Sequence, residues 1–197
     1  MCSAIVTGAT RGIGRAVAAG LADAGWTVHA MGRDRSVLED LRARHGVMPL
    51  ALDLTDRESC AETVRTLGVD TLVHTAFRWP QADTLTAADQ VDLDTALEVN
   101  LSATLHIVRA LLPNMARLIV ALPDGTPPSL GQMTAGAVAG LIAGLQAEAK
   151  PLNAQLVRYE TALILDVAGR IVEDLCGAGN GTTAAGRSAA AGQERLQ

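Results

Sequence analysis

The chain has 197 residues, a formal net charge of −5 and 49% hydrophobic residues, of which few are aromatic (2% of the chain). This length allows one substantial hydrophobic core, which Ala, Leu and Val must fill in place of aromatic side chains. The acidic balance, without a run of basic residues, argues against a nucleic-acid partner.

The first predicted element is a short strand at residues 4–7, and no signal peptide is recognised before it. Glycines follow at positions 8, 12 and 14, and a helical pattern covers residues 13–24. In a dinucleotide site, Gly8 allows the tight turn, Gly12 lets the backbone approach the pyrophosphate, and Gly14 lets the helix pack close to the strand. The positive helix end then faces the phosphates. The alternative is a strand-to-helix turn that binds no ligand.

Strand and helix patterns alternate along the rest of the chain, which indicates a parallel sheet covered on both faces. Further strands are predicted at residues 27–31, 47–52, 71–75, 117–122 and 155–159. Further helices are predicted at residues 36–45, 57–67, 89–112, 131–149 and 166–176. The sequence therefore predicts an α/β fold with three layers, α/β/α, around a Rossmann-type doubly wound parallel sheet.

The last third of the chain contains two segments of unusual composition. The uncharged stretch at residues 130–147 has the length of a membrane span, but Gly and Ala interrupt it, so a buried helix and no membrane contact are expected. Residues 177–197 are rich in Gly, Ala, Ser and Thr, which predicts a flexible tail. Three cysteines, Cys2, Cys60 and Cys176, have no paired spacing and indicate a reducing cytoplasm without a metal site.

The spacing Thr-Gly-x-x-x-Gly-x-Gly at residues 7–14 resembles that of the short-chain dehydrogenase/reductase family, and the similarity extends from about Ser3 to about Cys176. The chain looks like the 3-oxoacyl-carrier-protein reductases of that family. The resemblance implies that residues 1–176 form a single NADP(H)-binding domain. It also implies cofactor contacts from the glycine turn and the later strand ends, namely Thr7, Gly8, Thr10, Arg11, Gly12, Ile13, Gly14, Arg33, Asp53, Leu54 and Ala76.

The choice between the two nicotinamide cofactors depends on charged residues near the second and third strands. Arg11 and Arg33 stand where NADP-preferring relatives carry basic residues, and a 2′-phosphate requires a guanidinium. Asp34 opposes this interpretation because a carboxylate suits the free 2′-hydroxyl of NAD. Alternatively, Asp34 caps the next helix and Arg33 is a solvated charge. Asp53 matches the family's adenine-binding Asp, or it caps the end of its strand.

The family's catalytic groups are only partly retained. Asn100 matches the Asn of the catalytic tetrad, whose irregular backbone holds a water in the proton relay, or it is a structural helix-kink residue. The Tyr and Lys of the family's Y-x-x-x-K motif fall on Gly131 and Ala135, and the Ser falls near Pro123 or Asp124. The resemblance therefore implies an active site without its usual proton donor, lysine and serine.

Another acid must replace the missing tyrosine if the chain is a reductase. Tyr159, at the end of the last predicted strand, is the replacement best placed by position, although an aromatic side chain that only packs at the sheet end is the alternative. His74, His106 and Asp124 are further candidates. Phe77 replaces a glycine of the family's Asn-Asn-Ala-Gly segment and is expected to point towards the nicotinamide side.

Two functions remain open at this stage. The first is an NADP(H)-dependent reductase of a small-molecule or carrier-bound carbonyl, with altered catalytic groups. The second is a catalytically silent relative that binds nucleotide and supports an active enzyme. The family's substrate-covering segment after the sixth strand is missing, so we expect a fold truncated at the C-terminus with an open pocket. The small residues at 131–149 indicate a helix buried on more than one side, and the resemblance implies that this helix and the one at 89–112 form the interface of a homodimer or of a heterodimer with a paralogue. Alternatively, the helix is covered only by its own sheet.

Overall fold

The structure of the protein, a computed structural model, describes residues 2–79, 84, 86–124, 128–148 and 152–177. The predicted tail at residues 177–197 lies outside the described residues except for Gly177, which ends the last helix.

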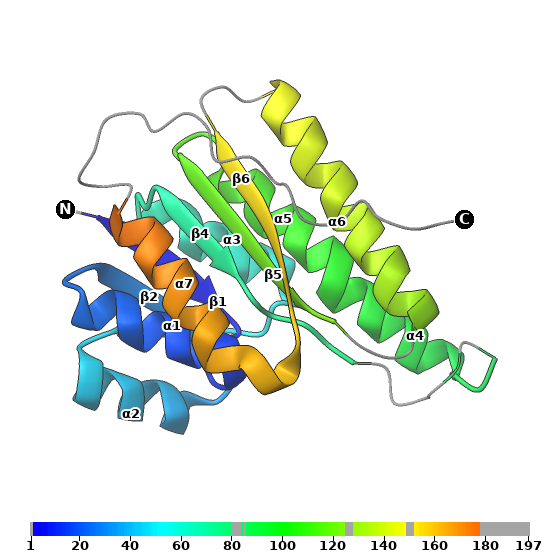
Figure 1. Ribbon diagram of the computed structural model, residues 1–197, viewed down its shortest axis with the longest axis horizontal. Coiled ribbons are helices and arrows are strands. Elements are labelled where there is room, and N and C mark those ends of the chain that lie inside the picture. Colours follow the sequence, from blue (N-terminus) through cyan, green and yellow to red (C-terminus); the bar gives the residue numbers. More distant parts are fainter. Residues whose placement is uncertain (1, 80–83, 85, 125–127, 149–151, 178–197) are drawn as a thin grey trace, which may run out of the picture.

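Six parallel strands form one sheet in the order β3-β2-β1-β4-β5-β6 (Figure 1). The strands are β1 (Ser3–Thr7), β2 (Thr27–Gly32), β3 (Met48–Ala51), β4 (Thr71–His74), β5 (Arg117–Pro123) and β6 (Asn153–Tyr159). Each predicted strand is confirmed with small shifts of its ends. The sheet order reverses between β1 and β4, as expected for a doubly wound fold.

Helices cover both faces of this sheet, which confirms the predicted α/β architecture (Figure 1). One face carries α1 (Gly12–Asp23), α2 (Arg35–His45) and α7 (Ile164–Gly177), preceded by a 3₁₀ turn at Thr161–Leu163. The other face carries α3 (Arg57–Thr66), α4 (Gln90–Leu97), α5 (Ala103–Leu111) and α6 (Pro128–Glu148). Among the described helices, none is both long and apolar enough to cross a membrane.

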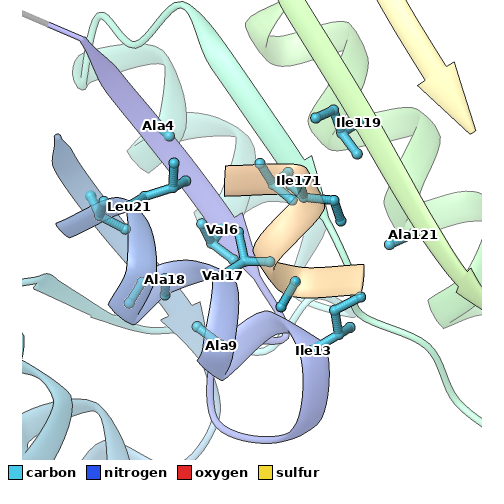
Figure 2. Packing of buried hydrophobic residues seen from close by; sticks show 14 of the residues in the cluster. Ala4, Val6, Ala9, Ile13, Val17, Ala18, Leu21, Ile119, Ala121 and Ile171 are labelled. Atoms are coloured by element: carbon cyan, nitrogen blue, oxygen red, sulfur yellow. The ribbon is translucent and has the colours of Figure 1, made fainter. Parts of the chain in front are cut away.

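Two hydrophobic cores lie on opposite faces of the sheet because successive residues of a strand point in opposite directions. On β1, Ala4 and Val6 pack in the core under α1 and α7, whereas Ile5 packs in the core under α3, α5 and α6. Figure 2 shows the first core, where Val17 of α1 and Ile171 of α7 meet the side chains of β1. The cores hold the carboxyl ends of the strands at one edge, where the site is built.

The helix predicted at residues 89–112 is present as a continuous helical segment, but a π-helical turn at Glu98–Ser102 lies between α4 and α5. Asn100 lies in this turn, is buried, and exchanges two hydrogen bonds with the backbone of Arg78. The Arg78 N–H donates to Oδ1 at 2.8 Å, and the Asn100 Nδ2 donates to the Arg78 carbonyl at 3.0 Å. The partner of this turn is far away in the sequence, so helical periodicity alone did not reveal it.

Candidate functional site

A cavity of about 880 Å³ runs along the carboxyl edge of the sheet, where the segments that follow the strands converge. A ligand crevice at this edge, beside the point where strand order reverses, is the general rule for open α/β sheets. Most of the predicted cofactor residues line it, namely Gly8, Thr10, Arg11, Gly12, Ile13, Arg33, Asp53, Leu54 and Ala76. Strand ends that are far apart in the sequence therefore lie together in one site.

The glycine turn between β1 and α1 has a backbone that side chains would not permit. Gly8 and Gly12 have φ of +70° and +53°, in the left-handed region. A Cβ on Gly8 would lie 2.9 Å from the Ala76 nitrogen, and one on Gly14 would lie 2.3 Å from the Thr75 Oγ1. At Gly12 the nearest atom would be 3.9 Å away, so this position opens onto the cavity.

Helix α1 begins at this turn and leaves its first N–H groups available. Its N-cap residue, Arg11, makes no side-chain capping hydrogen bond, and the first turn of the helix has no acidic residue. The unsatisfied N–H groups and the helix dipole favour an anion at this end. The arrangement fits a pyrophosphate better than a neutral group.

At the ends of β2 and β3, the charged residues have separate partners. Asp34 is the N-cap of α2, where its Oδ1 accepts from the amides of Ser36 and Val37 and from the Ser36 hydroxyl. The Ser36 hydroxyl bond is the main reason that the pKa of Asp34 is lowered. Arg33 is largely exposed, and its NH1 lies 3.8 Å from Oδ2 of Asp53. Both residues line the cavity, and Asp34 is held at the start of α2 through its Oδ1.

Asp53 caps the end of its strand and also lines the cavity. Its Oδ1 accepts from the amide of Thr55 at 3.0 Å and from the Thr55 hydroxyl at 2.8 Å, which ends the strand in a turn. The bond from the Thr55 amide lowers the pKa of Asp53 most, and Arg33 adds to this effect. The carboxylate therefore remains charged at the cavity wall.

Thr7 and Gly14 do not line the cavity, so their predicted cofactor contact is corrected. Thr7 is fully buried and ties the glycine turn to the segment after β4. Its Oγ1 accepts from the amides of Thr75 and Ala76, and its carbonyl accepts from the Thr75 hydroxyl at 2.7 Å. Both residues support the cavity wall from behind, which for Gly14 is the close packing expected from the sequence.

A buried polar network continues from Thr7 to the π-helical turn. The Thr104 hydroxyl donates to the Asn100 carbonyl at 3.0 Å, so it must accept from His74 Nε2, 2.8 Å away. His74 Nδ1 is then the acceptor for the Thr7 hydroxyl at 2.9 Å. Burial lowers the pKa of His74 to about 4, consistent with this neutral imidazole. Asn100 likewise lies outside the cavity lining and positions the segment at Arg78.

The end of the cavity near β4, β5 and β6 is lined by Phe77, Arg78, Trp79, Pro123 and Tyr159. Of the four acids considered as a replacement for the missing tyrosine, Tyr159 alone lines the cavity. Burial raises the pKa of Tyr159, and the charge of Arg11 opposes this effect. The phenol is therefore protonated at neutral pH and can donate a hydrogen bond.

The other candidate acids have different environments. His74 is enclosed in the polar network, and Nδ1 of His106 lies 2.8 Å from the Ser102 carbonyl. Asp124 forms an ion pair with Arg158 at 2.6 Å. Neither Gly131 nor Ala135 lines the cavity, and Ala135 packs in the second core.

Several residues that line the cavity were not predicted from the sequence. Thr75, Arg78 and Trp79 belong to the segment that follows β4, and the convergence of strand ends at one edge is a signal that could have found them. Thr95 and Val99 also line the cavity, but they do not follow a strand. The π-helical turn between α4 and α5 determines which side of the helix faces the cavity, and no pattern in the sequence indicated it.

The amino-acid sequence is similar to that of a known family and of several relatives. The family described as short chain dehydrogenase matches residues 3–120. A short-chain type dehydrogenase/reductase of Sinorhizobium fredii is 34% identical over 112 residues, which is 57% of this chain and 45% of the relative. The D-erythrulose reductase of Gallus gallus is 30% identical over 170 residues, which is 86% of this chain and 63% of the relative. The chain spans about half the length of the first of these relatives.

Solved structures have the same fold. A short-chain dehydrogenase from Streptomyces avermitilis matches with a TM-score of 0.66 at 26% identity, over 81% of this chain and 64% of that chain. An alcohol dehydrogenase from the archaeon Thermococcus sibiricus, complexed with 5-hydroxy-NADP, matches with a TM-score of 0.76 at 21% identity, over 89% and 90% of the two chains.

Proposed function

The chain belongs to the short chain dehydrogenase family, and from this premise we propose that it is an oxidoreductase that binds NADP(H) along the carboxyl edge of its sheet and reduces a carbonyl compound. The observation that carries the proposal is the glycine turn. Gly12 opens onto the cavity, and the uncapped end of α1 offers its N–H groups to a pyrophosphate.

NADP(H) is the proposed cofactor because of the residues at the end of β2. Both Arg33 and Asp34 line the cavity; the Arg33 guanidinium has a distant ion-pair partner, Asp53 at 3.8 Å, whereas the Asp34 Oδ1 is engaged as a helix cap. A guanidinium recognises a 2′-phosphate, and the engaged carboxylate is poorly available to a ribose hydroxyl. The cofactor in the Thermococcus sibiricus structure is also of the NADP type.

The chain must supply a proton to the carbonyl oxygen. A nicotinamide cofactor, when bound, supplies the hydride that reaches the carbonyl carbon. Tyr159 then donates a hydrogen bond to the substrate oxygen and a proton to the alkoxide as it forms. Since its pKa is raised, the phenol is a weak acid, and because the described residues include no lysine we expect slow turnover.

The test is NADPH oxidation in the presence of a panel of ketones and aldehydes, with NADPH binding measured separately by calorimetry. Tyr159→Phe is expected to lower turnover by about 10²-fold or more, as for loss of a general acid, and to leave NADPH affinity unchanged. Arg158→Gln is the neighbouring control, because Arg158 pairs with Asp124 at the sheet end. Turnover that survives in Tyr159→Phe would contradict the assigned role.

A catalytically silent nucleotide-binding relative is the second candidate function. The positions of the family's Tyr and Lys hold Gly131 and Ala135, and neither lines the cavity. This function predicts NADPH binding with no turnover on any carbonyl of the panel. Absence of NADPH binding would contradict both functions.

We also propose that the protein forms a homodimer, or a heterodimer with a paralogue, through α6. Small residues are exposed on this helix, including Gly136, Ala137, Gly140 and Gly144. At each of these three glycines an added Cβ would meet no atom within 4 Å, so a partner helix has room for close approach.

A further inference from the structure

The aromatic side chains of this protein are unevenly distributed. The chain has two tryptophans, one tyrosine and one phenylalanine. Three of these four, Phe77, Trp79 and Tyr159, line the cavity at the ends of β4 and β6. The fourth, Trp26, precedes β2 at the opposite edge of the sheet and packs against the first core. Aliphatic residues fill most of the interior, and aromatic surface is concentrated where a substrate must bind.

Phe77 and Trp79 form a defined pair. Their ring centroids are 5.0 Å apart and their planes are inclined by 72°, an edge-to-face arrangement. Phe77 packs against the second core, whereas Trp79 is not among the described residues that pack against either core. The Trp79 ring is partly exposed and lines the cavity. Packing of the protein interior therefore does not account for it.

The backbone between the two rings is held firmly. The two hydrogen bonds with Asn100 fix the N–H and the carbonyl of Arg78, as described above. The Arg78 guanidinium donates to Asp92 Oδ1 at 2.9 Å, so a carboxylate balances its charge. The rings on either side are thus preorganised, and the wall they form is aromatic rather than strongly cationic.

We propose that the Phe77–Trp79 pair is a recognition wall for a carbonyl substrate whose carbonyl group is conjugated to a planar ring, such as an aryl ketone or an aryl aldehyde. The proposal rests on the proposed oxidoreductase function for the use of this ligand. A flat ring gains contact with the aromatic wall, which a saturated ring of the same size cannot reproduce as well. Tyr159, which lines the same end of the cavity and packs in the first core, is the proposed donor for the carbonyl oxygen.

Two ketones that differ only in the ring test this inference. Acetophenone and cyclohexyl methyl ketone are titrated by ligand-observed NMR, each with and without saturating NADPH, and NADPH binding is measured alone by calorimetry. We expect acetophenone to bind about three- to tenfold more tightly, from the usual size of an aromatic pair contact. NADPH is expected not to displace it.

Three variants test whether the preference for acetophenone depends on the Phe77–Trp79 wall. Trp79→Leu is expected to abolish the preference for acetophenone, whereas Trp79→Phe, which keeps a ring, retains it. Trp26→Leu is the matched control, because it removes the tryptophan outside the cavity, and it is expected to retain the preference. Melting temperatures of all variants show whether each is folded.

Equal affinity for the two ketones, or a preference that persists in folded Trp79→Leu, would overturn the proposal. Displacement of acetophenone by NADPH would also overturn it, because the wall would then hold the nicotinamide ring. If NADPH fails to bind but the preference is present and depends on Trp79, the aromatic site stands and the oxidoreductase function fails. If NADPH binds but acetophenone is not preferred over cyclohexyl methyl ketone, the aromatic site fails and the oxidoreductase function stands.

Discussion

Arg33 and Asp34 are neighbours at the end of β2 and both line the cavity, but they are engaged differently. The Arg33 side chain is 73% exposed at the cavity, and the Asp34 carboxylate caps α2. Arg33→Ala is therefore expected to reduce the preference for NADPH over NADH by about tenfold or more, since a charge-assisted bond contributes about 1.5–3 kcal/mol. Calorimetric titration with both cofactors measures this preference.

Arg35→Ala is the control for this prediction, because Arg35 starts α2 and does not line the cavity. It is expected to leave the ratio of the two affinities unchanged. Equal affinity for NADPH and NADH in the unmodified protein would contradict the assignment of Arg33.

His74 makes the stability of the fold sensitive to acid. Its folded pKa of about 4 lies below the ordinary value of 6.5, because burial disfavours the charged ring. As the pH falls from 6.5 to about 4, the unfolded chain takes up a proton that the folded protein excludes. The contribution is complete above pH 6.5 and is lost on acidification, by about 3 kcal/mol in total.

His74→Gln tests this contribution, because an amide can also accept from Thr7 and donate to Thr104. Urea unfolding at several pH values is expected to show a weaker decline in stability between pH 6.5 and 4 than in the unmodified protein. An identical decline in both proteins would show that His74 is not the group responsible.

In the turn between β1 and α1, two glycines have different tasks. Gly12→Asn places a side chain in the cavity, in a left-handed backbone that Asn tolerates, so NADPH affinity is expected to fall at least about tenfold while the fold survives. Gly14→Ala brings a methyl group within 2.5 Å of the Gly8 carbonyl, and about 1–3 kcal/mol of stability is expected to be lost.

Gly46→Asn is the control for both substitutions. Gly46 has φ of +73° at the end of α2, and no atom lies within 4 Å of an added Cβ. Calorimetry and thermal unfolding of the three variants separate binding from stability. If Gly12→Asn binds NADPH as well as Gly46→Asn does, the cofactor does not pass over the glycine turn.

At the scale of the whole molecule, the exposed small residues of α6 are expected to make an interface between two chains. Gly140→Glu places a carboxylate there, and burying an unpaired charge is costly. The variant is expected to be monomeric in sedimentation velocity experiments, whereas Gly169→Glu, at an exposed glycine of α7, remains dimeric. A protein that is monomeric at high concentration without substitution would contradict the homodimer.

The amino-acid sequence determined the architecture of this protein and the part of its candidate site formed by the glycine turn, Arg33 and Asp53. Alternating strand and helix patterns predicted the parallel sheet, because side-chain periodicity is a local property. The glycine spacing at residues 8–14 predicted the turn, because the left-handed backbone and the close packing that require glycine are also local properties. Arg33 and Asp53 were predicted from the family resemblance, which is carried by the residues that follow the second and third strands.

Only the tertiary structure decided the rest of the site. The π-helical turn around Asn100 is held by the backbone of Arg78, a partner 22 residues away, so helical periodicity did not predict it. Tyr159, at the end of β6, is buried in the first core, and this burial raises the pKa of its phenol. The Phe77–Trp79 pair is local in the sequence, but it lines the same cavity as Tyr159 because β4 lies two strands from β6 in the sheet, although 80 residues separate Trp79 from Tyr159. Contacts of this range depend on how the sheet is assembled, which no local pattern records.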